Sequence, residues 1–485
     1  MKFNNFIYII ACLLLFNVIW AAGTYLIYPG YLDHGEPGMA LISWRLLDGH
    51  PAYLSFESPT LISNVYGPLT YSSHALFFWL FGTNAVSGKA ISFLSAILIP
   101  VFVFLTHSHK SIEIGAAGAI LASAIMLFLI PFSIWTRPES LMALLCVIAV
   151  WANNTSDPNK LEIGKSILIA IAASMAVGMK LHAGIYFVPI VIFHCMNKNR
   201  GFKVFLAMAL TGITIVSLPF FFSVFPIHDF WAWIYYHINK DSPSQFAFKY
   251  FRNGLIYLSA ALFYFLASRY SGKGHTLAEK VYFGLFLACL LVTLFPATKV
   301  GAGTYYFYPF LAILVDQILR HSVQVIKHQK KVWCLFAFLT TTLLIIGIPT
   351  QKRYFQSLNF EDNTAVKSEI SLILATYPDR TIEMGFGSNI STYSRTFHRT
   401  LLVMAGHPYT LDAAPAMELN MWKVPLPQET LAMIKKCRTD IWLIPKDEMP
   451  FKMIGYYGAP TLDIAFRKNF LASYKKLSSF KYFDI

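Results

Sequence analysis

Long apolar segments separated by short polar loops recur along the chain from its beginning to about Pro349. Each segment holds 14 to 23 residues, close to the roughly 20 residues that an α-helix needs to cross a bilayer. Residues 1–349 are therefore expected to form a mainly α, polytopic transmembrane helix bundle. About eleven helices are predicted, at residues 6–28, 86–106, 114–135, 139–152, 163–179, 183–196, 203–225, 253–268, 281–297, 304–320 and 332–349.

The distribution of Lys and Arg indicates the orientation of this bundle. With the N-terminus in the cytoplasm, the inner loops carry about twice as many Lys and Arg residues as the short outer loops, as the positive-inside rule requires. The first apolar segment is too long for the apolar region of a signal peptide, so we expect a retained span. An odd number of spans then places everything after Pro349 on the extracytoplasmic side.

The composition supports a membrane protein and argues against an ordinary soluble enzyme, because 56% of the residues are hydrophobic and only 13% are charged. A net charge of +14 could indicate nucleic-acid binding, yet the basic residues lie in short loops and form no long stripe. Five of the six cysteines lie inside apolar segments, so no disulfide framework is expected.

Two regions differ from the repeated apolar pattern. The apolar segment Leu69–Gly82 is short for a span, and we expect it to lie at the membrane interface. Residues 350–485 are more polar and are expected to form a small extracytoplasmic α/β domain. Its predicted strands are Thr381–Phe386 and Ile441–Ile444, and its predicted helices are Ala365–Thr376 and Glu429–Cys437.

Unusual polar residues collect at the outer ends of the predicted helices. Outer loops should be poor in cations, yet three cations each occupy a short outer turn. Polar groups held at membrane depth are functional candidates. The cations are Arg137, Lys180 and Lys299, and the neighbouring polar residues are Asp33, His34, Glu36, Glu139 and His182.

Each of these residues also has a structural interpretation. A single Arg or Lys at a helix end is commonly an anchor whose charge reaches the interface. Asp33 could cap a helix that Glu36-Pro37 opens and Gly49 ends. The histidines lack H-x-x-x-H and H-E-x-x-H spacing, so we expect no cofactor, and a divalent cation stays open.

Carboxylates and separated cations facing one pocket suit a reaction that deprotonates a hydroxyl and releases a phosphate. A carboxylate can accept the proton, a step that typically contributes about 10²- to 10⁴-fold to the rate. Arg and Lys can stabilise the charge that develops on the departing phosphate.

Several short motifs, in this order along the chain, resemble the GT-C superfamily of polytopic glycosyltransferases. The most similar members are the bacterial relatives of protein O-mannosyltransferases and of the lipid A aminoarabinose transferase. Leu32–Pro37 resembles the acidic motif of the first outer loop, and Tyr66–Tyr71 resembles Y-P-P-L-x-Y. Thr136–Glu139 resembles the R-P-D/E turn, and Lys180 and Thr298–Gly301 with Tyr305-Tyr306 resemble cationic positions near the lipid phosphate.

The resemblance implies an integral membrane glycosyltransferase of a bacterial inner membrane. It implies a polyprenyl-phosphate sugar donor and an acceptor hydroxyl on a lipid, a glycan or a protein. It further implies that a first-loop carboxylate is the base. Many relatives have adjacent Asp-Glu, whereas Asp33 and Glu36 are three positions apart, a spacing that shares one face of a helical turn. Either can be the base, and Asp33 is preferred.

By the same resemblance, Arg137, Lys180 and Lys299 would bind the donor phosphate. Glu139, His182 and Tyr305 would surround them. Tyr66, Trp231 and Trp233 could stack on sugar or acceptor, although interfacial anchoring explains the tryptophans equally well.

Two other functions stay open. A secondary transporter would place its polar residues near the bilayer midplane on repeated halves, but no internal repeat is present and Asp316 lies near a predicted cytoplasmic helix end. A lipid-linked glycan polymerase or ligase would favour large loops between spans. The sequence names neither the sugar nor the acceptor.

Overall fold

The computed structural model describes residues 3–62, 65–156, 163–198, 201–238, 254–270, 275–299, 301–326, 330–454 and 460–485. The chain divides into two compact units, each assembled from segments that are distant in sequence. We call them the bundle unit (Met1–Leu26, Ile91–Pro219 and Asp241–Gln356) and the mixed unit (Ile27–Ala90, Phe220–Lys240 and Ser357–Ile485).

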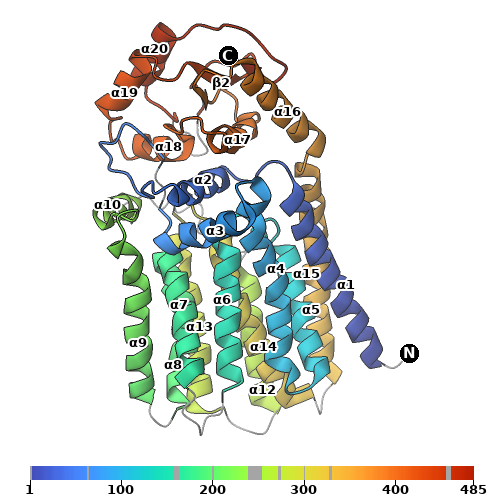
Figure 1. The fold of residues 1–485 in the computed structure, drawn as a ribbon. Helices are drawn as coiled ribbons and strands as arrows, with labels where there is room; N and C mark the ends of the chain where they lie inside the picture. Colours follow the sequence, from blue (N-terminus) through green and yellow to red (C-terminus); the bar gives the residue numbers. More distant parts are fainter. Residues whose placement is uncertain are drawn as a thin grey trace. The chain divides into compact units, whose positions relative to one another are not determined.

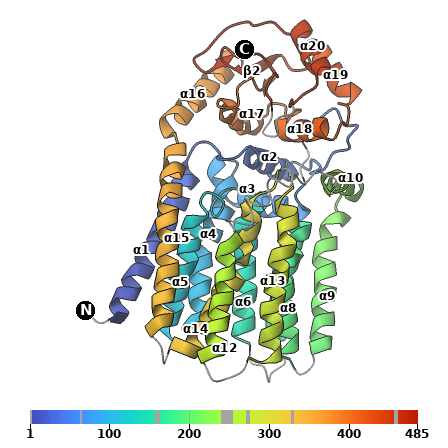
Figure 2. The same ribbon diagram turned by 180° about the vertical axis from the view of Figure 1, so that it is seen from behind.

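The bundle unit is built from long helices that run side by side in both ribbon views (Figures 1 and 2). Among its closest helix pairs are α6 with α7, α7 with α9, α8 with α13, and α12 with α14. The helices are α1 (Phe3–Ile27), α4 (Ala85–Ser108), α5 (Ile112–Phe128), α6 (Pro138–Asn154), α7 (Ile163–Met179), α8 (Gly184–Met196), α9 (Gly201–Ser217), α12 (Ser259–Tyr270), α13 (Leu277–Ala297), α14 (Leu311–Ile326) and α15 (Lys330–Ser357).

A helix lies in every one of the predicted apolar segments. Within the described residues, five helical stretches are long and apolar enough to cross a membrane, and the chain is a membrane protein. The number of helices that cross, predicted as about eleven, stays a prediction. The five stretches are Phe6–Ile27, Ala85–Ser108, Gly201–Phe221, Leu277–Ala297 and Cys334–Thr376.

Prolines account for two differences from the predicted helix bounds. The segment predicted to continue to residue 135 ends at Phe128, and Pro131 follows in a series of turns. The segment predicted from residue 304 begins as the 3₁₀ helix η4 (Thr304–Phe310), which contains Pro309, before α14 starts at Leu311. Proline lacks the backbone N–H that an α-helix interior requires and therefore disfavours α-helical geometry at these positions, although α4 and α15 each contain one, Pro100 and Pro349.

Small residues let α5 approach its neighbours closely. A Cβ atom on Gly118 would lie 2.9 Å from a Leu319 methyl of α14 and 3.0 Å from a Val103 methyl of α4. Helix packing inside a membrane depends on such small side chains, because lipid tails are as apolar as leucine and provide no hydrophobic drive.

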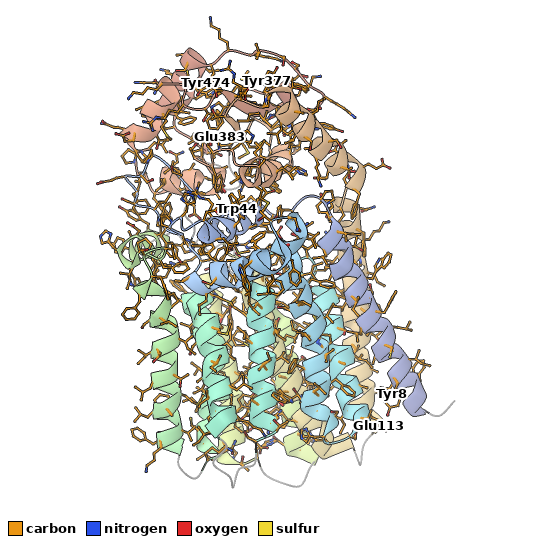
Figure 3. All side chains as sticks on the ribbon, viewed as in Figure 1. Tyr8, Trp44, Glu113, Tyr377, Glu383 and Tyr474 are labelled. Atoms are coloured by element: carbon orange, nitrogen blue, oxygen red, sulfur yellow. The ribbon has the colours of Figure 1, made fainter. Side chains whose placement is uncertain are left out.

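The N-terminal helix is joined to the bundle unit by polar contacts as well as apolar packing. The Tyr8 hydroxyl of α1 donates to the Glu113 carboxylate of α5 at 3.3 Å, and both residues are labelled in Figure 3. Asn17 donates to Gln351 of α15 at 3.2 Å. These contacts link the first helix to α5 and to α15.

The mixed unit contains short helices and a small sheet. Strands β1 (Ile382–Met384) and β2 (Ile441–Pro445) pair in parallel, and β3 (Phe483–Asp484) pairs antiparallel with β2. The helices are α2 (Gly35–Leu47), α3 (Pro68–Phe81), α10 (Ile227–Ile238), α16 (Phe360–Thr376), α17 (Arg399–Met404), α18 (Ala413–Met421), α19 (Gln428–Lys435) and α20 (Ile464–Ser473). The strands and helices predicted between residues 365 and 445 are confirmed.

One compact unit contains both the polar tail and the first loop. The sequence instead predicted a boundary between the helix bundle and the tail domain at residue 350. Leu61 pairs with Leu411 in a parallel bridge, with hydrogen bonds from Leu61 N to Thr410 O at 2.7 Å and from Asp412 N to Leu61 O at 2.8 Å. The segment predicted to lie at the interface forms α3, which packs on α2 in this unit. Residues of the first loop and of the tail therefore pack in one shared hydrophobic core.

The tail contains a buried carboxylate in β1, and hydrogen bonds from neighbouring residues compensate for its burial. Glu383, labelled in Figure 3, accepts hydrogen bonds from Thr410 N at 2.9 Å and from the hydroxyls of Thr410 and Thr439 at 2.6 and 2.5 Å. Burial raises the pKa of the Glu383 carboxyl, and these hydrogen bonds oppose that rise.

His398 should make the stability of the mixed unit depend on pH. Burial, and secondarily the charge of Lys89, lowers the pKa of His398 to about 4, and its Nε2 lies 2.8 Å from Asn363 Oδ1. The unfolded chain therefore gains a proton at higher pH than the folded chain does. Stability should be lost as the pH falls from about 6.5 toward 4, by about 2 kcal/mol between pH 7 and 5.

Thermal unfolding of the full chain in detergent at pH 7, 6 and 5 tests this expectation. His398→Gln should reduce the pH dependence, whereas the control His228→Gln, at a side chain that is 94% exposed, should not. Equal pH dependence in wild type and His398→Gln would contradict it.

Candidate active site

The turn that starts α6 places Arg137 beside two aromatic side chains of the bundle unit. Pro138 occupies the first helical position, and the preceding Arg137 is extended, with φ −142° and ψ 163°, as the residue before a proline prefers. Its guanidinium carbon lies 4.4 Å from the Trp135 ring centroid and 5.0 Å from that of Tyr305. The centroids of these two rings are 5.1 Å apart, so Arg137 lies beside a pair of neighbouring aromatic rings, a favourable arrangement for a cation.

Glu139, in the first turn of α6, is the buried acceptor of this cluster. Its Oε1 accepts a hydrogen bond from the ammonium of Lys180, and its Oε2 accepts from the Trp135 indole at 3.2 Å. The Lys180 and Glu139 side chains are 8% and 1% exposed. Both carboxylate oxygens are thus hydrogen-bonded, as a buried charge requires.

Two tyrosines of η4 complete the arrangement around Lys180. The Lys180 Nζ lies 5.2 Å from the Tyr305 ring centroid and 5.1 Å from that of Tyr306. His182, two residues after Lys180, stacks on Tyr306 with ring centroids 4.5 Å apart. We call Trp135, Arg137, Glu139, Lys180, His182, Tyr305 and Tyr306 the cation–aromatic cluster.

Lys299 lies in the turn that follows α13. Its Nζ is 5.2 Å from the Phe295 ring centroid. Gly301 in the same turn has φ +86°, a conformation that glycine adopts without strain, and its carbonyl accepts a hydrogen bond from the Tyr305 hydroxyl at 2.7 Å. The Lys299 turn is therefore connected to the cluster through Tyr305.

Asp33 and Glu36 belong to the mixed unit, in a segment (residues 28–36) that we call the acidic loop. Glu36 is fully buried, and its Oε2 accepts from the amides of Leu32 and Asp33, both at 2.7 Å. Asp33 keeps 23% of its side chain exposed, accepts from Gly35 N at 2.9 Å and lies 3.4 Å from His34 Nδ1. The two carboxylates, equivalent in the sequence, therefore have different surroundings.

The helix expected after the acidic loop is present as α2. Its N-cap is His34, and Asp33 accepts from the first helical amide, that of Gly35. The predicted end at Gly49 is confirmed, because this glycine has φ +76° two residues after the helix ends.

The proposed stacking residues of the mixed unit differ in exposure. Tyr66 is buried beside Tyr53 and Tyr71, and its carbonyl accepts from the Tyr53 hydroxyl at 2.7 Å. Trp233 is also buried, with its indole donating to Leu54 O at 2.8 Å, whereas Trp231 is half exposed. Burial of Tyr66 and Trp233 is explained by core packing.

Sequence reasoning missed Lys89, near the start of α4. Its ammonium is 1% exposed and donates to the carbonyls of Tyr28 and Gly30 at 2.5 and 2.7 Å. The signal was available, because a lysine at the predicted outer end of a span is as unexpected as Lys180. Trp135 was not predicted as a site residue either, because its contact with Glu139 depends on the turn geometry.

The structure thus forms two groups of the predicted site residues. The cation–aromatic cluster lies in the bundle unit, and Asp33 and Glu36 lie in the mixed unit. That both groups face one pocket stays a prediction. Among the described residues, no three or more His, Cys, Asp or Glu side chains are arranged to hold a metal ion.

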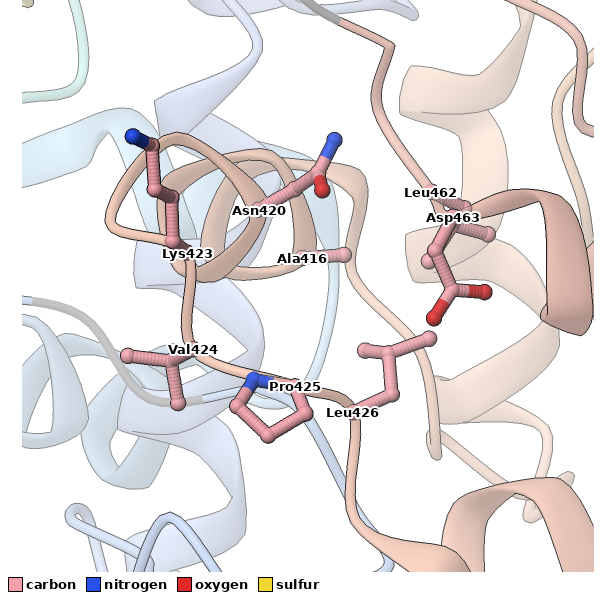
Figure 4. A pocket seen from close by; sticks show the side chains of 8 residues that line it. All are labelled: Ala416, Asn420, Lys423, Val424, Pro425, Leu426, Leu462 and Asp463. Carbon is pink, nitrogen blue, oxygen red and sulfur yellow. The ribbon is translucent and has the colours of Figure 1, made fainter.

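A separate cavity of about 230 Å³ lies in the mixed unit between α18, the loop that follows it and the start of α20 (Figure 4). Its walls are mostly apolar, and Asn420, Lys423 and Asp463 supply polar groups. Asp463 already caps α20 by accepting from Phe466 N at 2.6 Å.

The comparisons with known proteins identify the fold. No family model matches the chain, and no curated protein matches it in sequence. The structure is similar to that of ArnT from Cupriavidus metallidurans bound to undecaprenyl phosphate, with 13% identity and a TM-score of 0.52 over 90% of this chain and 93% of ArnT. The chain has a GT-C-type fold.

Two further solved structures are similar. ArnT from Cupriavidus metallidurans in the apo state gives a TM-score of 0.53 at the same 13% identity and the same coverage of both chains. Arabinosyltransferase EmbB from Mycobacterium smegmatis has 13% identity, covers 64% of this chain and 30% of its own, and has a TM-score of 0.43, too low to add to the assignment. The GT-C-type fold expected from the motifs is confirmed.

Removal of one partner from the Lys180–Glu139 pair should destabilise the bundle unit. Lys180→Met leaves the Glu139 carboxylate buried without its cation, and we expect the free energy of unfolding to fall by about 3–5 kcal/mol. Lys180→Met combined with Glu139→Gln should recover much of this loss. Thermal unfolding in detergent gives the comparison, with the exposed Lys203→Met as control. A loss no larger than that of Lys203→Met would show that the pair is not needed for stability.

Proposed function

We propose that this protein transfers a sugar from a polyprenyl-phosphate donor to a hydroxyl group at the extracytoplasmic face of the membrane. The observation that carries the proposal is the cation–aromatic cluster at the start of α6, in a chain with a GT-C-type fold. Two cations beside rings and a single buried carboxylate suit the binding of a lipid phosphate.

The cluster contains two cations, Arg137 and Lys180, and one carboxylate, Glu139. The Glu139 carboxylate neutralises the Lys180 ammonium, and both of its oxygens accept hydrogen bonds. Arg137 contributes a second cation that lies against Trp135 and Tyr305. A guanidinium can donate two parallel hydrogen bonds to a phosphate, so Arg137 is the preferred phosphate ligand, with Lys180 and Lys299 as further cations.

The donor class is supported by the shared fold. ArnT, which has this fold, was solved with undecaprenyl phosphate bound. In this chain the aromatic side of the cluster could contact a sugar, and the neighbouring apolar helices could contact the lipid chain. Transfer of the sugar breaks its bond to the phosphate oxygen and forms a bond to the acceptor oxygen, so negative charge builds on the phosphate that the cations face.

Asp33 is the preferred base. Glu36 accepts two backbone amides with one oxygen and is fully buried, which makes it a structural part of the acidic loop. Asp33 retains exposed surface and could accept the proton of an acceptor hydroxyl. We propose that Asp33 takes the proton of the acceptor hydroxyl and that the cations of the cation–aromatic cluster bind the donor phosphate, in a reaction at the outer membrane surface that the distribution of Lys and Arg predicts.

Replacing Asp33 and Glu36 one at a time should distinguish the base from the structural carboxylate. Asp33→Asn should lower kcat by about 10²- to 10⁴-fold, because the base is lost. Glu36→Gln should also lower the unfolding temperature, because Glu36 holds two backbone amides. The measurement is release of undecaprenyl phosphate from synthetic undecaprenyl-phosphate mannose, glucose and arabinose, with membrane extract as the source of acceptor.

Asp48→Asn, an exposed carboxylate at the end of α2, is the matched control and should retain the wild-type rate. Full activity of Asp33→Asn would exclude Asp33 as the base. Absence of release from every donor by the wild type would count against the proposed function for these sugars.

Arg137 should affect donor binding. Hydrogen bonds to charged groups contribute about 1.5–3 kcal/mol, so Arg137→Gln should weaken binding of undecaprenyl phosphate roughly 10- to 100-fold. Binding of the radiolabelled lipid to purified protein measures this without any acceptor. The control is Arg353→Gln, at an exposed arginine of α15. Unchanged affinity in Arg137→Gln would remove Arg137 from the phosphate site.

A further inference from the structure

An arginine of the tail contacts the acidic loop from 365 positions away in sequence. Arg399, the first residue of α17, donates from Nη2 to the carbonyl oxygen of His34 at 3.2 Å. The same Nη2 donates to Asp412 Oδ2 at 2.8 Å, and the side chains of this pair are 5% and 3% exposed. All of these residues belong to the mixed unit.

The contacted carbonyl belongs to the peptide group that holds Asp33. The His34 carbonyl and the Gly35 N–H are the two ends of one planar peptide unit. Its carbonyl accepts from Arg399, and its N–H donates to Asp33 Oδ1 at 2.9 Å. Rotation of this peptide plane would move the hydrogen bond that orients the Asp33 carboxylate. Arg399 therefore limits the orientations open to Asp33.

Asp412 fixes Arg399 in turn. As N-cap of α18, Asp412 accepts from Ala414 N at 3.0 Å with Oδ1, while Oδ2 accepts from Arg399 and from the Tyr409 hydroxyl. Its own amide donates to Leu61 O at 2.8 Å. Asp412 thus has little freedom to move, and the arginine bound to it is held by rigid secondary structure.

A glycine permits the close approach of α2 to these side chains. A Cβ atom on Gly38 would lie 2.9 Å from Asp412 Oδ2, 3.5 Å from the Tyr409 hydroxyl and 3.8 Å from Arg399 Nη2. Because Asp412 is held by several partners, it cannot easily move away. Any larger residue at position 38 should separate α2, and with it the acidic loop, from Arg399.

We infer that Arg399, which Asp412 holds in place, is a positioning residue for the base Asp33. A residue of the tail thereby orients a carboxylate of the acidic loop. The inference rests on the proposed function. It gives the tail a role in catalysis, because the tail sets the geometry of a carboxylate that follows the first helix. Lys89 contacts the same loop through the carbonyls of Tyr28 and Gly30.

The first test measures hydrogen exchange of the acidic loop in the full chain in detergent. Arg399→Gln and Gly38→Ala should each speed exchange of a peptide covering residues 30–36 at least 10-fold. Gly38→Ala changes no charge, so a shared effect reports loss of contact. The matched control is Arg438→Gln, which removes an exposed arginine of the tail and should leave exchange unchanged.

The second test separates positioning from folding and from donor binding. Arg399→Gln should lower kcat for undecaprenyl-phosphate release about 10- to 100-fold. The affinity for undecaprenyl phosphate should stay within about 2-fold, because that lipid is assigned to the cation–aromatic cluster. A protease-resistant tail must persist in the variant, as shown by limited proteolysis. Arg399→Lys, which keeps a charged donor, should recover part of kcat.

The outcomes distinguish the inference from the proposed function. Unchanged exchange in the acidic loop of both Arg399→Gln and Gly38→Ala would overturn the inference, whatever the activity. Faster exchange with wild-type kcat would also overturn it. Faster exchange in a protein whose wild type releases no undecaprenyl phosphate from any donor would contradict the proposed function, while the structural contact would stand.

Discussion

Buried, irregular backbone needs hydrogen-bond partners, and in this protein charged side chains supply many of them. In the acidic loop, Glu36 accepts amide hydrogens, and Lys89 and Arg399 donate to carbonyls. An unpaired backbone group in such surroundings would cost several kcal/mol, so these charges are fixed by folding before any substrate is present. What they leave for chemistry is Asp33, the carboxylate with exposed surface.

The need of buried polar groups for partners also explains the arrangement of the cation–aromatic cluster. Lys180 and Glu139 neutralise each other inside the bundle unit, and Trp135 occupies the second oxygen of the carboxylate. Arg137 lies beside the rings of Trp135 and Tyr305 instead, and a guanidinium is a group that can bind a phosphate with two parallel hydrogen bonds. Arg137 and Lys180 are equivalent phosphate candidates in the sequence, whereas in the structure Lys180 is paired with Glu139 and Arg137 lies against aromatic rings.

Local patterns in the sequence predicted local structure well. The apolar segments, the turn before Pro138, the glycine after α2 and the strands around Glu383 follow from periodicity and from the conformational preferences of proline and glycine. Contacts between distant segments were not predictable in this way. The pairing of Leu61 with Leu411, and the approach of Arg399 to His34, depend on complementary surfaces that no short window of sequence contains.

The pairing of Leu61 with Leu411 has a consequence for protein engineering. The first loop and the tail are joined by the bridge between Leu61 and Leu411, by the hydrogen bond from Asp412 N to Leu61 O, and by the hydrogen bond from the Thr430 hydroxyl to Pro59 O. The two segments therefore form one structural unit that can only be exchanged as a whole. A chimera that replaces only the tail of this protein with that of another GT-C-type chain would break a shared core. Successful recombination would have to transfer both segments together, although residues 91–356 separate them along the chain.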